Sequence, residues 1–156
     1  MTDQTRHVLT VSQLSASYGD TQILHTLDLA VPPGKITVIV GANASGKSTL
    51  LRTMSRLLTP ASGQVLLDGR SIHETPTREL ARKIGLLPQS PIAPEGILVD
   101  DLVRRGRHPH HGLFSSWTRR DEEAVQHALA ATRTAELAER PVDELSGGQR
   151  QRVWIA

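Results

Sequence analysis

The distribution of apolar residues divides the chain into a first half rich in predicted strands and a helical second half. Alternating apolar and polar side chains predict a strand over residues 23–31, and a second strand is expected to open at Val8-Leu9-Thr10-Val11. Residues 36–40 are nearly all apolar and β-branched, which is typical of a central strand buried on both faces. Shorter strands are expected at residues 64–67 and 84–87.

Apolar residues at helical spacing predict the helices. One stripe of leucines and a methionine predicts a helix over residues 47–58, and shorter helices are expected over residues 77–83 and 99–104. The segment Thr118-Arg119-Arg120-Asp121 resembles a capping box, so we expect a further helix to begin there. The residues expected on one face of that helix are Val125, Ala128, Leu129 and Thr132.

The composition is that of a soluble globular domain, with 38% hydrophobic residues, 22% charged residues and a net charge of +2. There is no cysteine, which excludes a disulfide framework and a thiolate metal site. The arginines are spread along the chain, with one cluster at Arg104-Arg105-Gly106-Arg107, so we expect no nucleic-acid partner. Residues 1–6 lack the apolar core of a signal peptide, and no apolar run is long enough to span a bilayer. Any link to a membrane is therefore expected to come through a partner.

A glycine-rich segment follows the predicted strand 36–40 and reads Gly41-Ala42-Asn43-Ala44-Ser45-Gly46-Lys47-Ser48. It fits the phosphate-binding pattern G-x-x-x-x-G-K-[ST], in which backbone N–H groups and a helix N-terminus surround an anion. Lys47 is expected to reach the β- and γ-phosphates, and the Ser48 hydroxyl to ligate Mg²⁺. Because Ala44 carries a Cβ, we expect it to have a negative φ.

A second candidate phosphate site reads Leu145-Ser146-Gly147-Gly148-Gln149 and is followed by Arg150-Gln151-Arg152. Leu145 is expected to anchor in apolar surface, while Ser146 and the glycine N–H groups at a helix start can bind a phosphate. The alternative interpretation is a serine-capped helix with glycines as a linker.

Together these segments resemble the ATP-binding subunits of ATP-binding-cassette (ABC) importers. Further matching residues are Arg56-Leu57-Leu58-Thr59-Pro60, Leu67-Asp68-Gly69 and Leu86-Leu87-Pro88-Gln89. The subgroup that serves iron–siderophore, haem and cobalamin uptake is indicated by Arg105-Gly106-Arg107-His108-Pro109-His110 with Leu113-Phe114. The resemblance implies an α/β fold of the P-loop NTPase class: a RecA-like core with an antiparallel β subdomain and a helical subdomain.

The resemblance also implies a domain organisation. Residues 1–89 would form the β subdomain and P-loop core, residues 90–144 the helical subdomain, and residues 145–156 the signature motif with the start of the next helix. In the family, a Walker B aspartate, a catalytic glutamate and a switch histidine come later in the chain. We therefore expect residues 1–156 to be the N-terminal part of a longer ATPase, truncated before the Walker B strand, with feeble hydrolysis alone.

Site roles follow from the resemblance by position. Tyr18 would stack on the adenine of ATP, although it also reads as an ordinary turn tyrosine. The segment from Gly41 through Ser48 and Thr49 would hold ATP in one subunit, and Leu145 to Gln149 would hold it from the opposite subunit of a homodimer. Gln89 would contact Mg²⁺ and the attacking water, in support of Ser48.

The resemblance implies membrane permease subunits as partners, and indirectly a substrate-binding protein, at the cytoplasmic face of the cell membrane. Residues 90–116 would dock on the permease, although a solvated basic loop is the alternative for its arginine-rich part. A non-transport ABC ATPase and a non-catalytic ATP-binding fragment also remain open as functions. The transported substrate does not follow from the sequence, because in such systems the permease and binding protein would select it.

Overall fold

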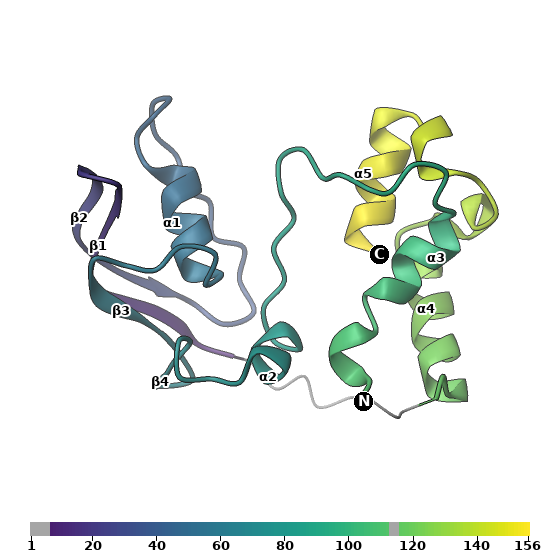
Figure 1. The fold of residues 1–156 in the computed structure, drawn as a ribbon, viewed down its shortest axis with the longest axis horizontal. Helices are drawn as coiled ribbons and strands as arrows, with labels where there is room; N and C mark the ends of the chain where they lie inside the picture. The colour runs from purple at the N-terminus through teal and green to yellow at the C-terminus, as the bar shows by residue number, and fades with distance from the viewer. Residues whose placement is uncertain (1–6, 113–115) are drawn as a thin grey trace. The chain divides into compact units, whose positions relative to one another are not determined.

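The computed structural model describes residues 7–112 and 116–156 (Figure 1). The chain divides into two compact units, Met1–Gly85 and Leu86–Ala156. The expectations for residues 1–6, and the subgroup indication from Leu113-Phe114, lie outside the described residues.

The first unit is built on a four-stranded antiparallel sheet with the order β2-β1-β3-β4. Its long hairpin consists of β1 (Leu9–Tyr18) and β2 (Thr21–Val31), joined by a tight turn. On its other edge, β1 pairs with β3 (Ser62–Leu67), which turns into the short β4 (Arg70–Ser71). The strands predicted near residues 8–11, 23–31 and 64–67 are thus confirmed.

Helix α1 (Lys47–Met54) lies beside β1 and β2 (Figure 1). Its Leu50 and Met54 side chains belong to the buried core of this unit. The short α2 (Thr77–Ala81) contributes Leu80 to the same core. This helix is two residues shorter than the predicted helix over residues 77–83. The buried apolar side chains of this core are Val11, Leu14, Ala16, Leu24, Leu50, Met54, Val65, Leu67, Ile72 and Leu80. Each of these side chains except that of Ala16 stabilises the unit by about 1.5–3 kcal/mol relative to an exposed one.

The prediction that the first helix runs to residue 58 is wrong, because α1 ends at Met54. Arg56 takes up a left-handed conformation with φ 61°. Its guanidinium donates hydrogen bonds to the carbonyl oxygens of Ile72, at 3.0 Å, and Thr75, at 2.7 Å. These tertiary hydrogen bonds outweigh the helical spacing of the leucines that follow.

The strands predicted at residues 36–40 and 84–87 are not found: both segments lie outside regular secondary structure. Ile36 is 95% exposed and Val40 is 84% exposed, the reverse of the burial predicted for them. A strand exists only through hydrogen bonds to a neighbouring strand. None of the described residues forms a ladder with residues 36–40, so apolar β-branched composition alone does not produce a strand there.

The second unit is helical and has a core of its own (Figure 1). Its helices are α3 (Val99–Arg105), α4 (Arg119–Ala131) and α5 (Gly147–Ile155), joined through the 3₁₀ turns η1 (His108–His110), η2 (Ala135–Leu137) and η3 (Val142–Glu144). The buried apolar residues are Ile97, Val99, Val103, Val125, Leu129, Leu137, Val142, Leu145 and Val153. Among the described residues, no helix is both long and apolar enough to cross a bilayer.

The predicted capping box at the start of α4 is confirmed. The Thr118 hydroxyl accepts a hydrogen bond from the Asp121 N–H, and the Asp121 carboxylate accepts one from the Thr118 N–H at 3.0 Å. Val125 and Leu129 are buried and Ala128 packs beside them, as the helical spacing predicted. The cap fixes where α4 begins and therefore which face it presents to the core.

Candidate functional site

The glycine-rich loop leads directly into α1 and contains two residues with positive φ. Gly46 caps the helix with φ 86°, and its carbonyl accepts the Leu50 N–H at 2.8 Å. Ala44 has φ 63°, so the predicted negative φ is wrong. The turn requires a left-handed residue at this position, and the alanine side chain is accommodated there at the cost of backbone strain.

Gly46 also brings the loop close to the sheet. A Cβ at this position would lie 2.8 Å from Leu24 Cδ2 and 3.2 Å from Ile23 Cγ2, both on β2. Glycine is therefore required by its φ and by this close approach. The packing against β2 fixes the N-terminus of α1, whose unpaired N–H groups and partial positive charge favour an anion.

Lys47, the first residue of α1, folds its side chain back over the loop. Its ammonium donates hydrogen bonds to the carbonyl oxygens of Gly41, at 2.9 Å, and Ala42, and to Ser45 Oγ at 3.3 Å. An ammonium has three donors, and these contacts use all of them. The cation is thus held by the loop itself, and its predicted contact with the β- and γ-phosphates stays a prediction.

A cavity of about 230 Å³ opens beside the loop. Ser48 is exposed, whereas Thr49 is buried in the unit and contributes to the cavity wall. The lining residues are Tyr18, Ile23, Ala44, Ser45, Gly46, Lys47, Ser48 and Thr49. The structure therefore brings Tyr18 together with the phosphate loop, although Ala44 lies 26 positions after Tyr18 in the sequence. Gly41, Ala42 and Asn43 precede this wall and lie exposed.

The second glycine motif forms a capped helix start. Ser146 Oγ accepts the Gln149 N–H at 3.3 Å, and Gln149 Oε1 accepts the Ser146 N–H at 3.0 Å. Leu145 is 5% exposed and belongs to the helical core, so the predicted apolar anchor is confirmed. Gly147 and Gly148 are exposed at the N-terminus of α5, where the first N–H groups of a helix have no intrahelical partner.

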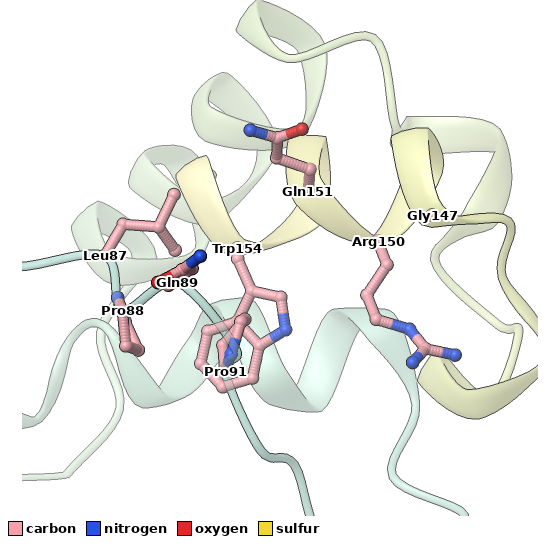
Figure 2. A pocket seen from close by; sticks show the side chains of 8 residues that line it. All are labelled: Leu87, Pro88, Gln89, Pro91, Gly147, Arg150, Gln151 and Trp154. Atoms are coloured by element: carbon pink, nitrogen blue, oxygen red, sulfur yellow. The ribbon is translucent and has the colours of Figure 1, made fainter. Parts of the chain in front are cut away.

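A larger cavity, of about 480 Å³, lies within the second unit between α5 and the segment that holds Gln89 (Figure 2). Its lining residues are Leu87, Pro88, Gln89, Pro91, Gly147, Arg150, Gln151 and Trp154. Gln89 thus faces the same space as the signature helix. It belongs to the second unit and Ser48 to the first, so a Mg²⁺ site shared by the two stays a prediction.

Sequence reasoning missed Arg150 and Trp154 as lining residues of this cavity. Gly147, Arg150 and Trp154 stand at i, i+3 and i+7 of α5, and Figure 2 shows the Arg150 and Trp154 side chains extending from one side of the helix. That spacing was the available signal. Arg150 is fixed by a 2.9 Å hydrogen bond from Nη2 to the Asp143 carbonyl oxygen.

The arginine cluster that the sequence marked as a docking surface is largely neutralised within its own unit. Arg104 pairs with Asp100 and, at 2.8 Å, with Glu122. Arg107 pairs with Asp121 at 2.9 Å. Two of the three arginines are therefore committed to internal ion pairs, and docking of this segment on a permease stays a prediction.

Asp121 is the hub of this network and is 4% exposed. Its carboxylate accepts hydrogen bonds from Thr118 and Arg107, and His111 Nε2 lies 3.2 Å away. The hydrogen bonds from Thr118, followed by that from Arg107, hold the pKa of Asp121 well below its usual range. The network joins the loop before α4 to the start of that helix.

A glycine loop with its lysine and serine at a helix N-terminus defines a nucleotide-phosphate-binding protein of the P-loop class. Within this class, the serine-capped glycine motif of α5 resembles the signature of the ABC ATPases. Residues 24–156 match the ABC transporter family, and the chain belongs to that family.

Relatives and solved structures agree with this assignment. The chain is 52% identical over 144 residues to the ferric enterobactin transport ATP-binding protein FepC of Escherichia coli, which covers 92% of this chain and 53% of that protein. It is 51% identical over 148 residues to the petrobactin import ATP-binding protein FpuD of Bacillus anthracis. This match covers 95% of this chain and 54% of that protein. The chain spans about half the length of these curated relatives.

Among solved structures, cbiO1 from Clostridium perfringens, part of the ABC transporter complex cbiONQ, superposes with a TM-score of 0.79 at 28% identity. The match covers 96% of this chain and 60% of that one. The α/β ABC ATPase fold that the sequence predicted, with its antiparallel sheet and helical part, is thereby confirmed.

Proposed function

We propose that the chain is the ATP-binding part of a subunit that energises an ABC importer, with iron–siderophore or related chelates as the cargo. The ATP-binding role is supported by the loop at α1, where Lys47 lies at the helix N-terminus beside a cavity. Tyr18 also lines this cavity. The names of the relatives, a ferric enterobactin transporter and a petrobactin importer, support the class of cargo.

ATP binding begins with an exchange at Lys47. Its three donors are all used by the loop, so a phosphate oxygen has to replace one of the present acceptors. Ser45 Oγ, at 3.3 Å, makes the longest of these contacts and is the one we expect to be released. A phosphate oxygen is a charged acceptor, so the exchanged hydrogen bond is stronger than the one it replaces.

The adenine and the metal ion complete the site. Tyr18 lines the cavity and offers its ring to the base, while the Ser48 hydroxyl is exposed at the helix start, where it can ligate Mg²⁺. Mg²⁺ bound there would supply positive charge against the triphosphate. Gln89 would contact Mg²⁺ and orient the attacking water.

The signature helix binds the same nucleotide from a second copy of the chain. Ser146 and the N–H groups of Gly147 and Gly148 form an anion site at the start of α5. Two such subunits would close around ATP and open after hydrolysis, which shifts the permease between its states by differential binding. The subunit would work at the cytoplasmic face of the membrane, with a substrate-binding protein as an indirect partner.

The test of ATP binding is a Mg-ATP titration by calorimetry, with Lys47→Ala as the key variant. We expect saturable binding that Lys47→Ala abolishes. Lys83→Ala is the matched control, because it removes a lysine of the same unit that lies outside the loop and forms a surface ion pair with Glu79. Equal affinity of the Lys47→Ala and Lys83→Ala proteins would refute the proposed role of the loop.

The test of the dimer is light scattering of the protein at increasing concentration, with and without Mg-ATP. We expect ATP to raise the average mass, and Ser146→Ala to weaken this increase. A constant monomer mass under both conditions would contradict the two-subunit site. Phosphate release measured on the same samples reports how much hydrolysis accompanies binding.

A further inference from the structure

Tyr18 has a hydrogen-bond partner that neither glycine motif contains. Its phenol oxygen accepts a hydrogen bond from Arg52 Nη1 at 3.2 Å. Tyr18 is the last residue of β1 and the only tyrosine of the chain, and its side chain is half-exposed. Its ring lines the cavity beside the phosphate loop.

Arg52 lies on α1, five residues after Lys47, which is about 7.5 Å along the helix axis. The helix that carries the phosphate-binding lysine therefore also holds the aromatic ring at the edge of the sheet. An arginine suits this task because its guanidinium stays charged and its donors have a fixed planar geometry. The Arg52 side chain is exposed, and no ion pair competes for it among the described residues.

We propose that Arg52 is a positioning residue for nucleotide binding, which holds the ring of Tyr18 beside the cavity before the base arrives. This inference rests on the proposed ATP-binding function. A half-exposed tyrosine at the end of a strand can rotate about two side-chain bonds, and a ligand that stacks on it has to arrest that rotation. The hydrogen bond from Arg52 restricts the ring beforehand, so less freedom is lost on binding.

The size of the effect follows from the cost of immobilising one side chain on binding, which corresponds to roughly a two- to tenfold change in affinity. An exposed hydrogen bond belongs at the lower end of this range. The phosphates are expected to bind around Lys47, at the other end of α1 from Arg52. Arg52 is therefore not expected to contact them.

The experiment compares ATP with inorganic triphosphate, which has the phosphates but no base. We expect Arg52→Ala to weaken ATP binding about two- to tenfold and to leave triphosphate binding unchanged. Arg52→Gln keeps an N–H donor and is expected to retain part of the affinity. If Arg52→Ala weakens both ligands equally, Arg52 acts on the phosphates through its charge, and the positioning role is overturned.

A double-mutant cycle tests whether the effect passes through the phenol oxygen. Tyr18→Phe keeps the ring and removes the hydroxyl, so Arg52→Ala should have no further effect on ATP affinity in the Tyr18→Phe background. Full additivity of the two substitutions would overturn the inference. Circular dichroism melting curves of all variants check that the exposed substitutions leave the fold intact.

A spectroscopic measurement reports the ring directly. Because the chain has one tyrosine, selective labelling gives one set of ring signals in the NMR spectrum. We expect Arg52→Ala to shift these signals in the nucleotide-free protein, whereas unchanged signals would overturn the inference. If the wild-type protein fails to bind ATP, the proposed function and this inference both fall. If it binds ATP and Arg52→Ala binds equally well, only the inference falls.

Discussion

Backbone strain at Ala44 predicts that Ala44→Gly raises the free energy of unfolding, whereas the same substitution at the nearby Ala42 lowers it. Ala44 has φ 63° in the phosphate loop, a conformation that costs an alanine about 1–2 kcal/mol and a glycine almost nothing. Ala44→Gly removes this cost. It also adds freedom to the unfolded chain, which costs about 0.4–1 kcal/mol. The net expectation is that Ala44→Gly raises the free energy of unfolding by about 1 kcal/mol.

Ala42→Gly is the matched control, since it is the same substitution two residues earlier in the same loop. Ala42 does not adopt a positive φ, so only the cost in the unfolded state applies. Ala42→Gly should therefore lower the free energy of unfolding by about 0.4–1 kcal/mol. The two variants are expected to move in opposite directions, with a separation of about 1.5 kcal/mol between them.

Urea unfolding followed by circular dichroism measures this separation, and the melting temperatures should differ in the same order. A change of about 1 kcal/mol corresponds to roughly 2–4 °C for a chain of this size. Equal destabilisation by both substitutions would refute the reasoning, because it would mean that the conformation of Ala44 carries no strain.

Three further predictions concern other parts of the fold. The pKa of Asp121 is lowered in the folded state, so its stabilisation is complete above about pH 4 and is lost as the pH falls below; Asp121→Asn should flatten this acid limb in unfolding curves. A Cβ at Gly63 would lie 2.2 Å from the Gln13 carbonyl oxygen, so Gly63→Ala should cost about 3 kcal/mol of stability. Gly69→Ala, at a similar φ but in open space, should cost only about 1 kcal/mol, and equal losses would contradict the steric argument. Ser146→Ala removes the cap of α5 and should cost about 1 kcal/mol in urea unfolding, whereas Ser146→Thr should retain most of it.

The parts of the fold that the sequence predicted are those with local causes. The hairpin follows from alternation over residues 23–31, and the start of α4 from the capping box at Thr118. The capped start of α5 at Ser146 follows from the same kind of local signal. In each case the residues that form the element also carry the signal for it.

The errors arose where the composition of a segment does not by itself decide its conformation. Residues 36–40 have the composition of a buried strand, but a strand depends on its neighbours for hydrogen bonds. The end of α1 is set by what Arg56 binds 16 and 19 residues later in the chain. The conformation of Ala44 follows from the geometry of the turn rather than from its own preference.

The candidate site divides in the same way. The phosphate loop and the signature segment are contiguous in sequence and could be read directly from it. Arg52 could not be found in this way, because its role depends on a contact with Tyr18, 34 residues earlier. Trp154 was predictable, because it stands seven residues after Gly147 and therefore on the same face of α5.

The exposed segment 36–40 has a thermodynamic consequence for the loop that follows it. Gly41 begins where this segment ends, so the loop is anchored through α1 on one side and joined to irregular backbone on the other. Holding a phosphate fixes the loop, and fixing each additional backbone residue costs about 1–2 kcal/mol. A strand that paired with residues 36–40 would order them in advance and so tighten ATP binding. Because such coupling is reciprocal, bound ATP would strengthen the pairing of residues 36–40 by the same factor. Formation of the sheet and binding of the nucleotide are therefore thermodynamically coupled.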